Sequence, residues 1–170
     1  MLYSPKKHNS VILAVICTVL MLASVFMLGY HALGSFSLLG LPIAVVAIQL
    51  AQRYMLTSYV YRLTPSDELD VSNDLAVIKV QNNTEKTVCN LSLYEAKELV
   101  EIKSLRELEK RYGKVATAYN FCAEPFAQSA YWLIEEFNGS RIAVKLQCEE
   151  EFAQELRRRI GVRSEAELFE

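Results

Sequence analysis

The twenty residues from Val11 to Tyr30 carry no charge, and this stretch constrains the fold more than any other feature of the chain. A helix of about twenty apolar residues is long enough to cross the hydrocarbon core of a bilayer. A second uncharged stretch, Leu33 to Ala51, follows after a short link, and membrane helices tolerate the glycine and the proline that interrupt it. The two stretches predict a transmembrane hairpin over residues 1–53, with helices at about 11–30 and 33–52.

Two other interpretations of the first stretch are open. A buried hairpin inside a soluble protein has a similar length, but no charged face relieves either stretch. A signal peptide also follows basic residues, but its apolar core usually has only about 7–15 residues. Lys6 and Lys7 precede the pair of helices, and Arg53 and Arg62 follow it. Since cytoplasmic flanks are enriched in Lys and Arg, we expect a multi-pass protein of the plasma membrane with both termini in the cytoplasm.

The charges divide the chain into two parts. Residues 1–54 hold no acidic residue, whereas residues 55–170 hold all 20 acidic residues and 15 of the 18 basic ones. A net-acidic domain argues against nucleic acid as a partner, because nucleic-acid-binding domains present a basic face. Three Asn-x-Ser/Thr sequences, at Asn82, Asn90 and Asn138, are the best argument against the cytoplasmic orientation, since a lumenal domain would expose them to glycosylation.

The cysteines fit a reducing compartment. Cys17 lies in the first apolar stretch, and Cys89, Cys122 and Cys148 are far apart among apolar or strand-like neighbours. In a cytoplasmic domain such residues are typically small buried hydrophobes. The sequence has no CxxC spacing and no histidine near these cysteines, so it gives no indication of a metal site. We expect neither a metal nor a cofactor.

Residues 54–170 predict one domain of about seven antiparallel strands followed by a helix. Aromatic and β-branched residues, period-two alternation and turn residues such as the "TPSDE" segment mark the strands. Asn138-Gly139 is the strongest hairpin signal, because both residues readily adopt positive φ. The expected strands are 54–64, 69–81, 87–93, 99–103, 115–124, 130–137 and 140–147.

The segment from Ser92 to Gly113 allows two interpretations. Its many helix-forming residues are compatible with one long helix. Alternatively, it forms a helical turn at 94–97, a short strand at 99–103 and a short helix at Leu105–Arg111. We favour the second interpretation, because "LVEIK" alternates and because a second capping signal, Ser104 with Glu107, would be redundant inside one helix.

The last element is a helix at Glu149–Ile160. Three glutamates begin it and Arg157, Arg158 and Arg159 end it, so both ends complement the helix dipole. Gly161 is the expected stop. Phe152, Leu156 and Ile160 form one apolar stripe that predicts packing against the sheet.

This order of elements resembles a bacterial pleckstrin-homology-like domain, in which a C-terminal helix closes one end of a bent sheet or barrel. The pieces that carry the resemblance are "YVYRL", "VCNLSLYEAKELVEI", "AYNFCA" and "RIAVKLQCEEEFAQELRRRI". The resemblance implies an α+β fold, with an N-terminal transmembrane hairpin ahead of an antiparallel β domain capped by a helix. The helix at Leu105–Arg111 departs from the simplest version of that fold.

Catalysis is not expected. The only histidines, His8 and His31, lie outside residues 54–170, so that part of the chain lacks an imidazole for a Ser/His/Asp or Cys/His arrangement. Phosphate loops and zinc-protease or hydrolase motifs do not occur in the sequence. Glu135 and Glu136 adjoin on an expected strand, so their side chains point to opposite faces. No small-molecule substrate is evident.

Three non-catalytic functions are compatible with the sequence. The first is a membrane-anchored interaction or scaffold module for an unidentified protein, with Tyr131 and Trp132, one facing the core and one the surface, as candidate anchors. The second is a domain that recognises anionic lipid, with Arg157, Arg158 and Arg159 as candidate membrane contacts. The acidic loop Thr64–Glu68 disfavours phosphate binding at the position that the resemblance implies. The third is an accessory subunit of a larger membrane assembly.

Overall fold

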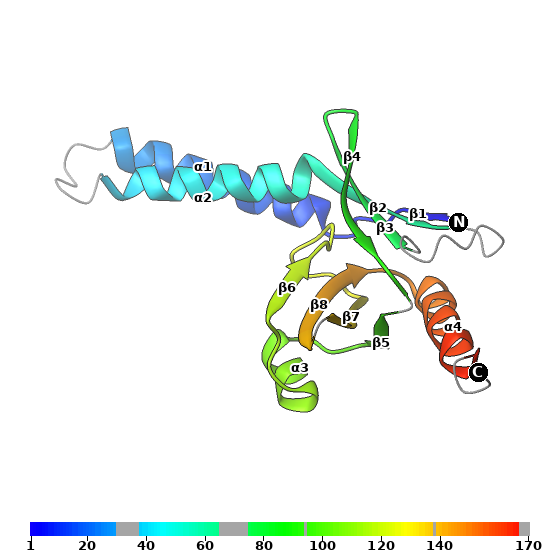
Figure 1. The fold of residues 1–170 in the computed structure, drawn as a ribbon. Coiled ribbons are helices and arrows are strands. Elements are labelled where there is room, and N and C mark those ends of the chain that lie inside the picture. The colour runs from blue at the N-terminus through cyan, green and yellow to red at the C-terminus, as the bar shows by residue number, and fades with distance from the viewer. Residues whose placement is uncertain (30–37, 65–74, 94, 138, 167–170) are drawn as a thin grey trace.

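The computed structural model describes residues 1–29, 38–64, 75–93, 95–137 and 139–166. The fold is α+β, as predicted: a pair of helices projects from two four-stranded sheets, and a helix ends the chain (Figure 1). The strands form two separate sheets that face each other, whereas the sequence suggested one bent sheet or barrel.

The projecting pair consists of α1 (Ser10–Gly29) and α2 (Gly40–Leu50), which lie side by side and antiparallel (Figure 1). A π-helical turn, η2 (Ala51–Met55), continues α2. Among the described residues, α1 alone is long and apolar enough to cross a membrane, and a signal sequence would pass the same test. The expected second helix began at residue 33, and residues 30–37 lie outside the described part of the chain.

The two helices approach each other most closely at Gly40. The Ser24 hydroxyl donates a hydrogen bond of 2.8 Å to the carbonyl oxygen of Gly40. A Cβ atom on Gly40 would lie 2.8 Å from the carbonyl oxygen of Ser24 and 2.7 Å from Cγ of Leu28. Glycine is therefore required here, because any side chain would collide with the backbone of α1.

We expect Gly40→Val to separate α1 from α2 and to lower the stability of the helix pair by about 1–2 kcal/mol, because interhelical packing and the bond from Ser24 are lost. Thermal unfolding of the detergent-solubilised full chain measures the effect. Gly29→Val is the matched control, since nothing lies within 4 Å of its added Cβ atom. Equal losses in the two variants would contradict the close approach.

The first sheet has the order β1-β2-β3-β4, and all its neighbours are antiparallel. Its strands are β1 (Leu2–Tyr3), β2 (Thr57–Leu63), β3 (Leu75–Gln81) and β4 (Thr84–Leu91). Asn82 and Asn83 take positive φ angles of 51° and 58° in the turn between β3 and β4. Residues 65–74, which include most of the expected "TPSDE" turn, lie outside the described residues.

The short strand β1 was not expected from the sequence, which placed residues 1–53 in the hairpin. The backbones of Met1 and Leu63 exchange two hydrogen bonds of 2.8 Å, and the Tyr3 ring stacks on Phe152 at a centroid distance of 4.5 Å. The residues before α1 therefore pack into the same β domain as the residues that follow η2.

The second sheet has the order β5-β7-β8-β6. Its strands are β5 (Ala96–Val100), β6 (Thr117–Asn120), β7 (Ala130–Phe137) and β8 (Ser140–Gln147). β7 and β8 form the expected hairpin, with Gly139 at φ 73°. The expectation of an entirely antiparallel arrangement is wrong for β6, which pairs parallel to β8. One edge of β8 pairs with β7, and β6 pairs with the other edge. β6 therefore does not pair with β7, the strand that follows it in the chain.

The segment 92–112 forms a strand and a helix, as favoured above. β5 begins three residues before the expected strand, and α3 (Leu105–Tyr112) follows. Ser104 caps α3 by accepting a hydrogen bond of 3.3 Å from the backbone N–H of Glu107. The expected helical turn at 94–97 is wrong for Ala96 and Lys97, which belong to β5, and residue 94 lies outside the described residues.

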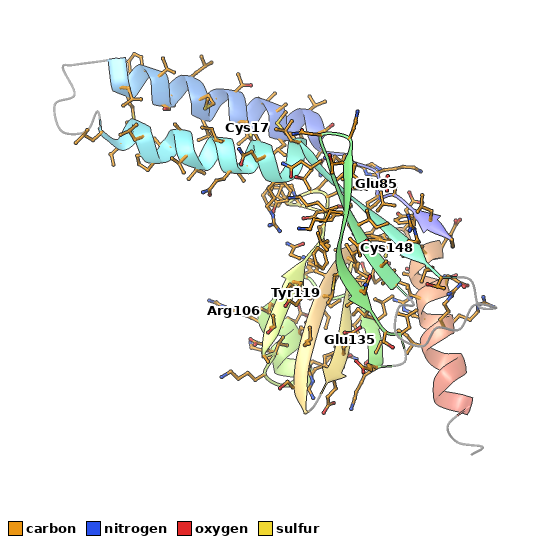
Figure 2. All side chains as sticks on the ribbon, turned by 45° about the horizontal axis from the view of Figure 1, so that its top comes forward. Cys17, Glu85, Arg106, Tyr119, Glu135 and Cys148 are labelled. Carbon is orange, nitrogen blue, oxygen red and sulfur yellow. The ribbon has the colours of Figure 1, made fainter. Side chains whose placement is uncertain are left out.

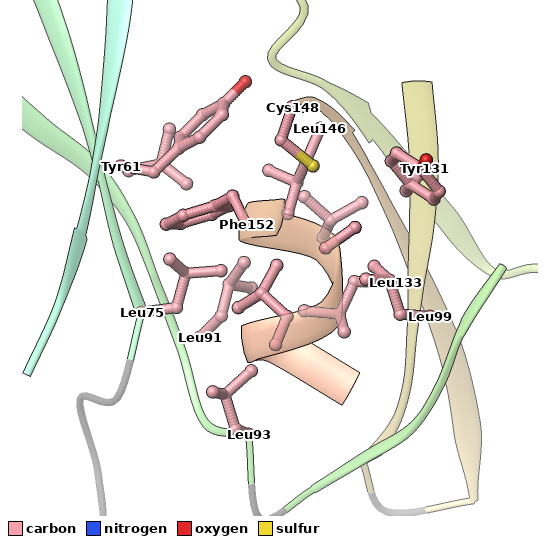
Figure 3. Close-up of a cluster of buried hydrophobic side chains, with 14 of the residues drawn as sticks. Tyr61, Leu75, Leu91, Leu93, Leu99, Tyr131, Leu133, Leu146, Cys148 and Phe152 are labelled. Carbon is pink, nitrogen blue, oxygen red and sulfur yellow. The ribbon is translucent and has the colours of Figure 1, made fainter. Parts of the chain in front are cut away.

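The C-terminal helix, α4 (Glu150–Ala166), packs Phe152, Ala153 and Leu156 between the sheets (Figure 3). The predicted stop at Gly161 is wrong, because α4 continues to Ala166. A glycine inside a helix costs only about 1 kcal/mol relative to alanine, so it does not by itself end one.

Each face of the second sheet covers a separate core. One face meets the first sheet and α4 across the larger cluster, which includes Leu133, Val144 and Leu146. The opposite face lies under α3, where Leu108 packs on Trp132 and Ile134. The second sheet is therefore buried on both faces, and this determines where its aromatic residues lie.

Candidate functional site

The two aromatic residues proposed as partner anchors are both buried. Tyr131 is 3% exposed and donates a hydrogen bond of 2.6 Å to Oε2 of Glu150. Trp132 is 5% exposed and donates a hydrogen bond of 3.0 Å to the carbonyl oxygen of Ile102. The expectation that one of them faces the surface is wrong, because α3 covers the second face of the sheet. Both rings are core residues with satisfied polar groups.

The three arginines of α4 bind groups of the β domain itself. Arg157 pairs with Glu150 at 3.0 Å, and Arg158 and Arg159 pair with Glu155 at 2.9 and 3.0 Å. Arg159 also donates a hydrogen bond of 2.6 Å to the carbonyl oxygen of Thr64.

Thr64 lies at the end of β2 that is remote from the hairpin, since η2 precedes the other end. A seven-residue strand spans roughly 20 Å, which exceeds the Debye length of about 8 Å in physiological salt. These arginines are therefore separated from the base of the hairpin.

The residues just before α1 and those of η2 form the base of the helix pair, and polar contacts join them there. The Nζ atom of Lys7 donates hydrogen bonds of 2.7 Å to the carbonyl oxygens of Tyr54 and Thr57. A cation at this position complements the negative end of the α2–η2 helix dipole. Burial lowers the pKa of Lys7, and the Glu124 carboxylate opposes that shift.

Glu124 and Asn120, from the region around β6, join the base to the second sheet. The buried carboxylate of Glu124 accepts a hydrogen bond from the backbone N–H of Asn9, directly before α1. The guanidinium of Arg53, in η2, donates a hydrogen bond of 3.1 Å to the carbonyl oxygen of Asn120. The hairpin is therefore held to the sheets at both of its ends.

A polar cavity of about 320 Å³ opens between η2 and the first sheet. In the part of the chain that the structure describes, its charged lining residues are Arg53 and Lys79, and none is a carboxylate. The remaining lining residues are Gln49, Gln52, Thr57, Tyr59 and Gln81. This set of amides and cations suits an anion with several acceptor oxygens.

The cavity lies at the hairpin end of the first sheet. Thr57, the first residue of β2, pairs with Gln81, and Gln81 pairs with Thr84 beside the β3–β4 turn. Figure 2 shows Glu85, the next residue of β4, near the base of α1 and α2. The cavity therefore lies beside η2, where the uncharged helix α2 ends and Arg53 is the first charged residue.

One row across the first sheet brings like charges together beside this cavity. Tyr59 pairs with Lys79, and Lys79 pairs with Lys86. Directly opposite residues of antiparallel strands share a face, and like charges there destabilise a sheet. Among the described residues, neither lysine forms an ion pair.

Three buried titratable groups of the domain, Cys122, Cys148 and Glu135, have raised pKa values. Burial raises the pKa of Cys122 to about 11 and that of Cys148 to about 12, so both thiols are protonated at neutral pH. Both are buried, as the sequence predicted, and Cys89 is half-buried. Glu135 is 6% exposed, and its Oε1 atom has no hydrogen-bond partner among the described residues. Burial and the nearby Glu95 raise its pKa to about 7.

Comparison of the chain with protein-family models, with curated proteins and with solved structures finds no match.

Sequence analysis did not identify the cavity at the base of the hairpin. Lys79 lies in the strand expected at 69–81, and Arg53 is one of the basic residues that predict the orientation of the helix pair. The one available signal was a lysine at an alternating position of a strand, "VIKVQ", where a core residue would otherwise be expected.

Proposed function

We propose that the chain is a non-catalytic interaction module that its helix pair anchors in a membrane. The observation that carries this proposal is the exposed apolar surface of a helix pair that projects away from the folded domain (Figure 1). Val11, Val19 and Leu22 are between 58% and 72% exposed, and α1 contains no charged residue. Such a surface is stable in hydrocarbon and unfavourable in water.

The connections at the base support a hairpin that returns to the side from which it entered. Residues 2–3 join the sheet that contains β2, and Lys7 binds the backbone carbonyls of η2. A folded β domain that holds both ends of the helix pair cannot lie on two sides of a bilayer. These contacts also argue against cleavage of α1 as a signal peptide, because cleavage would remove β1 from the first sheet.

The partner surface that we favour is the outer edge of β4. This strand is the edge of the first sheet, and six of its eight residues are exposed, with Leu91 buried and Cys89 half-buried. An edge strand presents unpaired backbone N–H and C=O groups that another chain is able to extend. An accessory role in a larger membrane assembly would use the same edge or the helix pair.

Reporter fusions test the anchor and its orientation. We expect fusions at Met1 and at Glu170 to give the cytoplasmic signal and a fusion at His31, between the helices, to give the signal of the opposite side. Alkaline extraction of membranes should leave the full chain in the pellet. An opposite signal from the Glu170 fusion, or release of the chain by alkali, would overturn the proposal.

Site-specific photo-crosslinking in the native membrane tests the partner surface. A photoreactive residue at Val88, which is 38% exposed on β4, should give one discrete protein adduct. Arg106, exposed on α3, is the control position (Figure 2). Adducts at Arg106 that equal those at Val88 would contradict docking along β4.

A further inference from the structure

The cavity beside η2 has two basic lining residues, Arg53 and Lys79, and no carboxylate among the residues that the structure describes around it. The Arg53 guanidinium donates one hydrogen bond to the Asn120 carbonyl oxygen, and Lys86 lies directly across the strand pair from Lys79. Lys86 is exposed on the edge strand β4, where water solvates its charge, and so it needs no bound anion. This explanation does not extend to Lys79, because β3 lies between β2 and β4.

The cavity lies at the end of the helix pair that joins the β domain. Gln49 belongs to α2 and Gln52 and Arg53 to η2, whereas Lys79 and Gln81 belong to β3. One wall thus continues from the apolar helix α2, and the other wall carries the polar side chains of Lys79 and Gln81 at the end of β3. In a membrane-anchored chain this is the depth of the lipid headgroups, where basic residues meet phosphate.

We propose that this cavity binds the phosphate group of an anionic phospholipid from the leaflet that faces the β domain. The guanidinium of Arg53 donates in a planar fork to two phosphate oxygens, and the Lys79 ammonium supplies a point charge. The amides of Gln49 and Gln52 donate to the remaining headgroup oxygens. The phosphate neutralises the repulsion between Lys79 and Lys86. This site rests on the proposed anchor, because the hairpin brings it to headgroup depth.

Binding of short-chain phosphatidylglycerol to the detergent-solubilised full chain tests the proposal, with short-chain phosphatidylcholine and inorganic phosphate as comparison ligands. We expect phosphatidylglycerol to bind more tightly than either. The double variant Arg53→Gln/Lys79→Gln should weaken that binding by about 30-fold, at roughly 1 kcal/mol for each basic residue. The exchange variant Arg53→Lys/Lys79→Arg keeps both charges but loses the fork at residue 53, so it should weaken binding by less than the double glutamine variant.

The matched control is Arg106→Gln/Lys110→Gln, which removes two exposed charges on α3. A loss under twofold in the cavity variant, or an equal loss in the control, would overturn the proposal. Inorganic phosphate that binds as tightly as phosphatidylglycerol would overturn the lipid as the source of the phosphate. Thermal unfolding verifies that each variant is folded. The reporter fusions score the anchor separately, so a failure of lipid binding is distinct from a failure of membrane insertion.

Discussion

Replacement of Phe152 by alanine is expected to lower the free energy of unfolding by about 3–5 kcal/mol. The side chain is 1% exposed, and its ring lies 4.5 Å from that of Tyr3 and 6.1 Å from that of Tyr61, measured between centroids. Phe152 therefore joins α4 to β1 and β2 at the centre of the larger core (Figure 3). Since domains are stable by only about 5–15 kcal/mol, the loss approaches the total stability.

Urea unfolding of the detergent-solubilised full chain, followed by tyrosine and tryptophan fluorescence, measures this loss. Glu151→Ala is the control, because residue 151 is the exposed neighbour on the same helix. It should change the stability by less than about 0.5 kcal/mol. A loss under about 1 kcal/mol for Phe152→Ala would show that α4 does not close the core.

The ionisation of Glu135 is expected to contribute a loss of stability as the pH rises from about 4.5 to about 7. Burial holds the pKa of this carboxyl at about 7 in the folded chain, against 4.5 for the ordinary group. The folded state therefore binds more protons than the unfolded state over this range, and stability is lost as the proton leaves. The full difference corresponds to about 3 kcal/mol above pH 7.

Glu135→Gln should remove this component of the pH dependence and should stabilise the protein at pH 8, with little effect at pH 4. Glu136→Gln is the matched control on the next residue of β7, whose carboxylate is partly exposed and pairs with Lys97 at 2.5 Å. Burial also raises the pKa of the Cys89 thiol near Glu135, and that group stays protonated throughout the range. Unfolding midpoints from pH 4 to 8 measure the difference. Parallel curves for the Glu135 variant and the unmodified chain would refute the prediction.

Elements that depend on neighbouring residues were predicted well from the sequence. The Asn138-Gly139 hairpin, the capped helix expected at 105–111 and the start of α4 each follow from turn, capping or periodicity signals within a few residues. The strand expected at 99–103 exists, but it lies three residues earlier, at 96–100. The uncharged stretch 11–30 likewise predicted α1 almost to the residue. These features are encoded locally, because backbone hydrogen bonding and side-chain entropy act over short separations.

The tertiary structure decided which surfaces meet. The two residues of β1 form a strand only because they pair with β2, since so short a segment has no strand signal of its own. The sequence of β6 likewise does not indicate that it pairs with the edge of β8. The burial of both Tyr131 and Trp132 depends on α3 covering the second face of the sheet. Lys79 gains its significance only when strand register sets it opposite Lys86 and the hairpin brings Arg53 beside it. Such contacts join residues far apart in the chain, and the free energy that selects them comes from packing and charge across the assembled fold rather than from local preference.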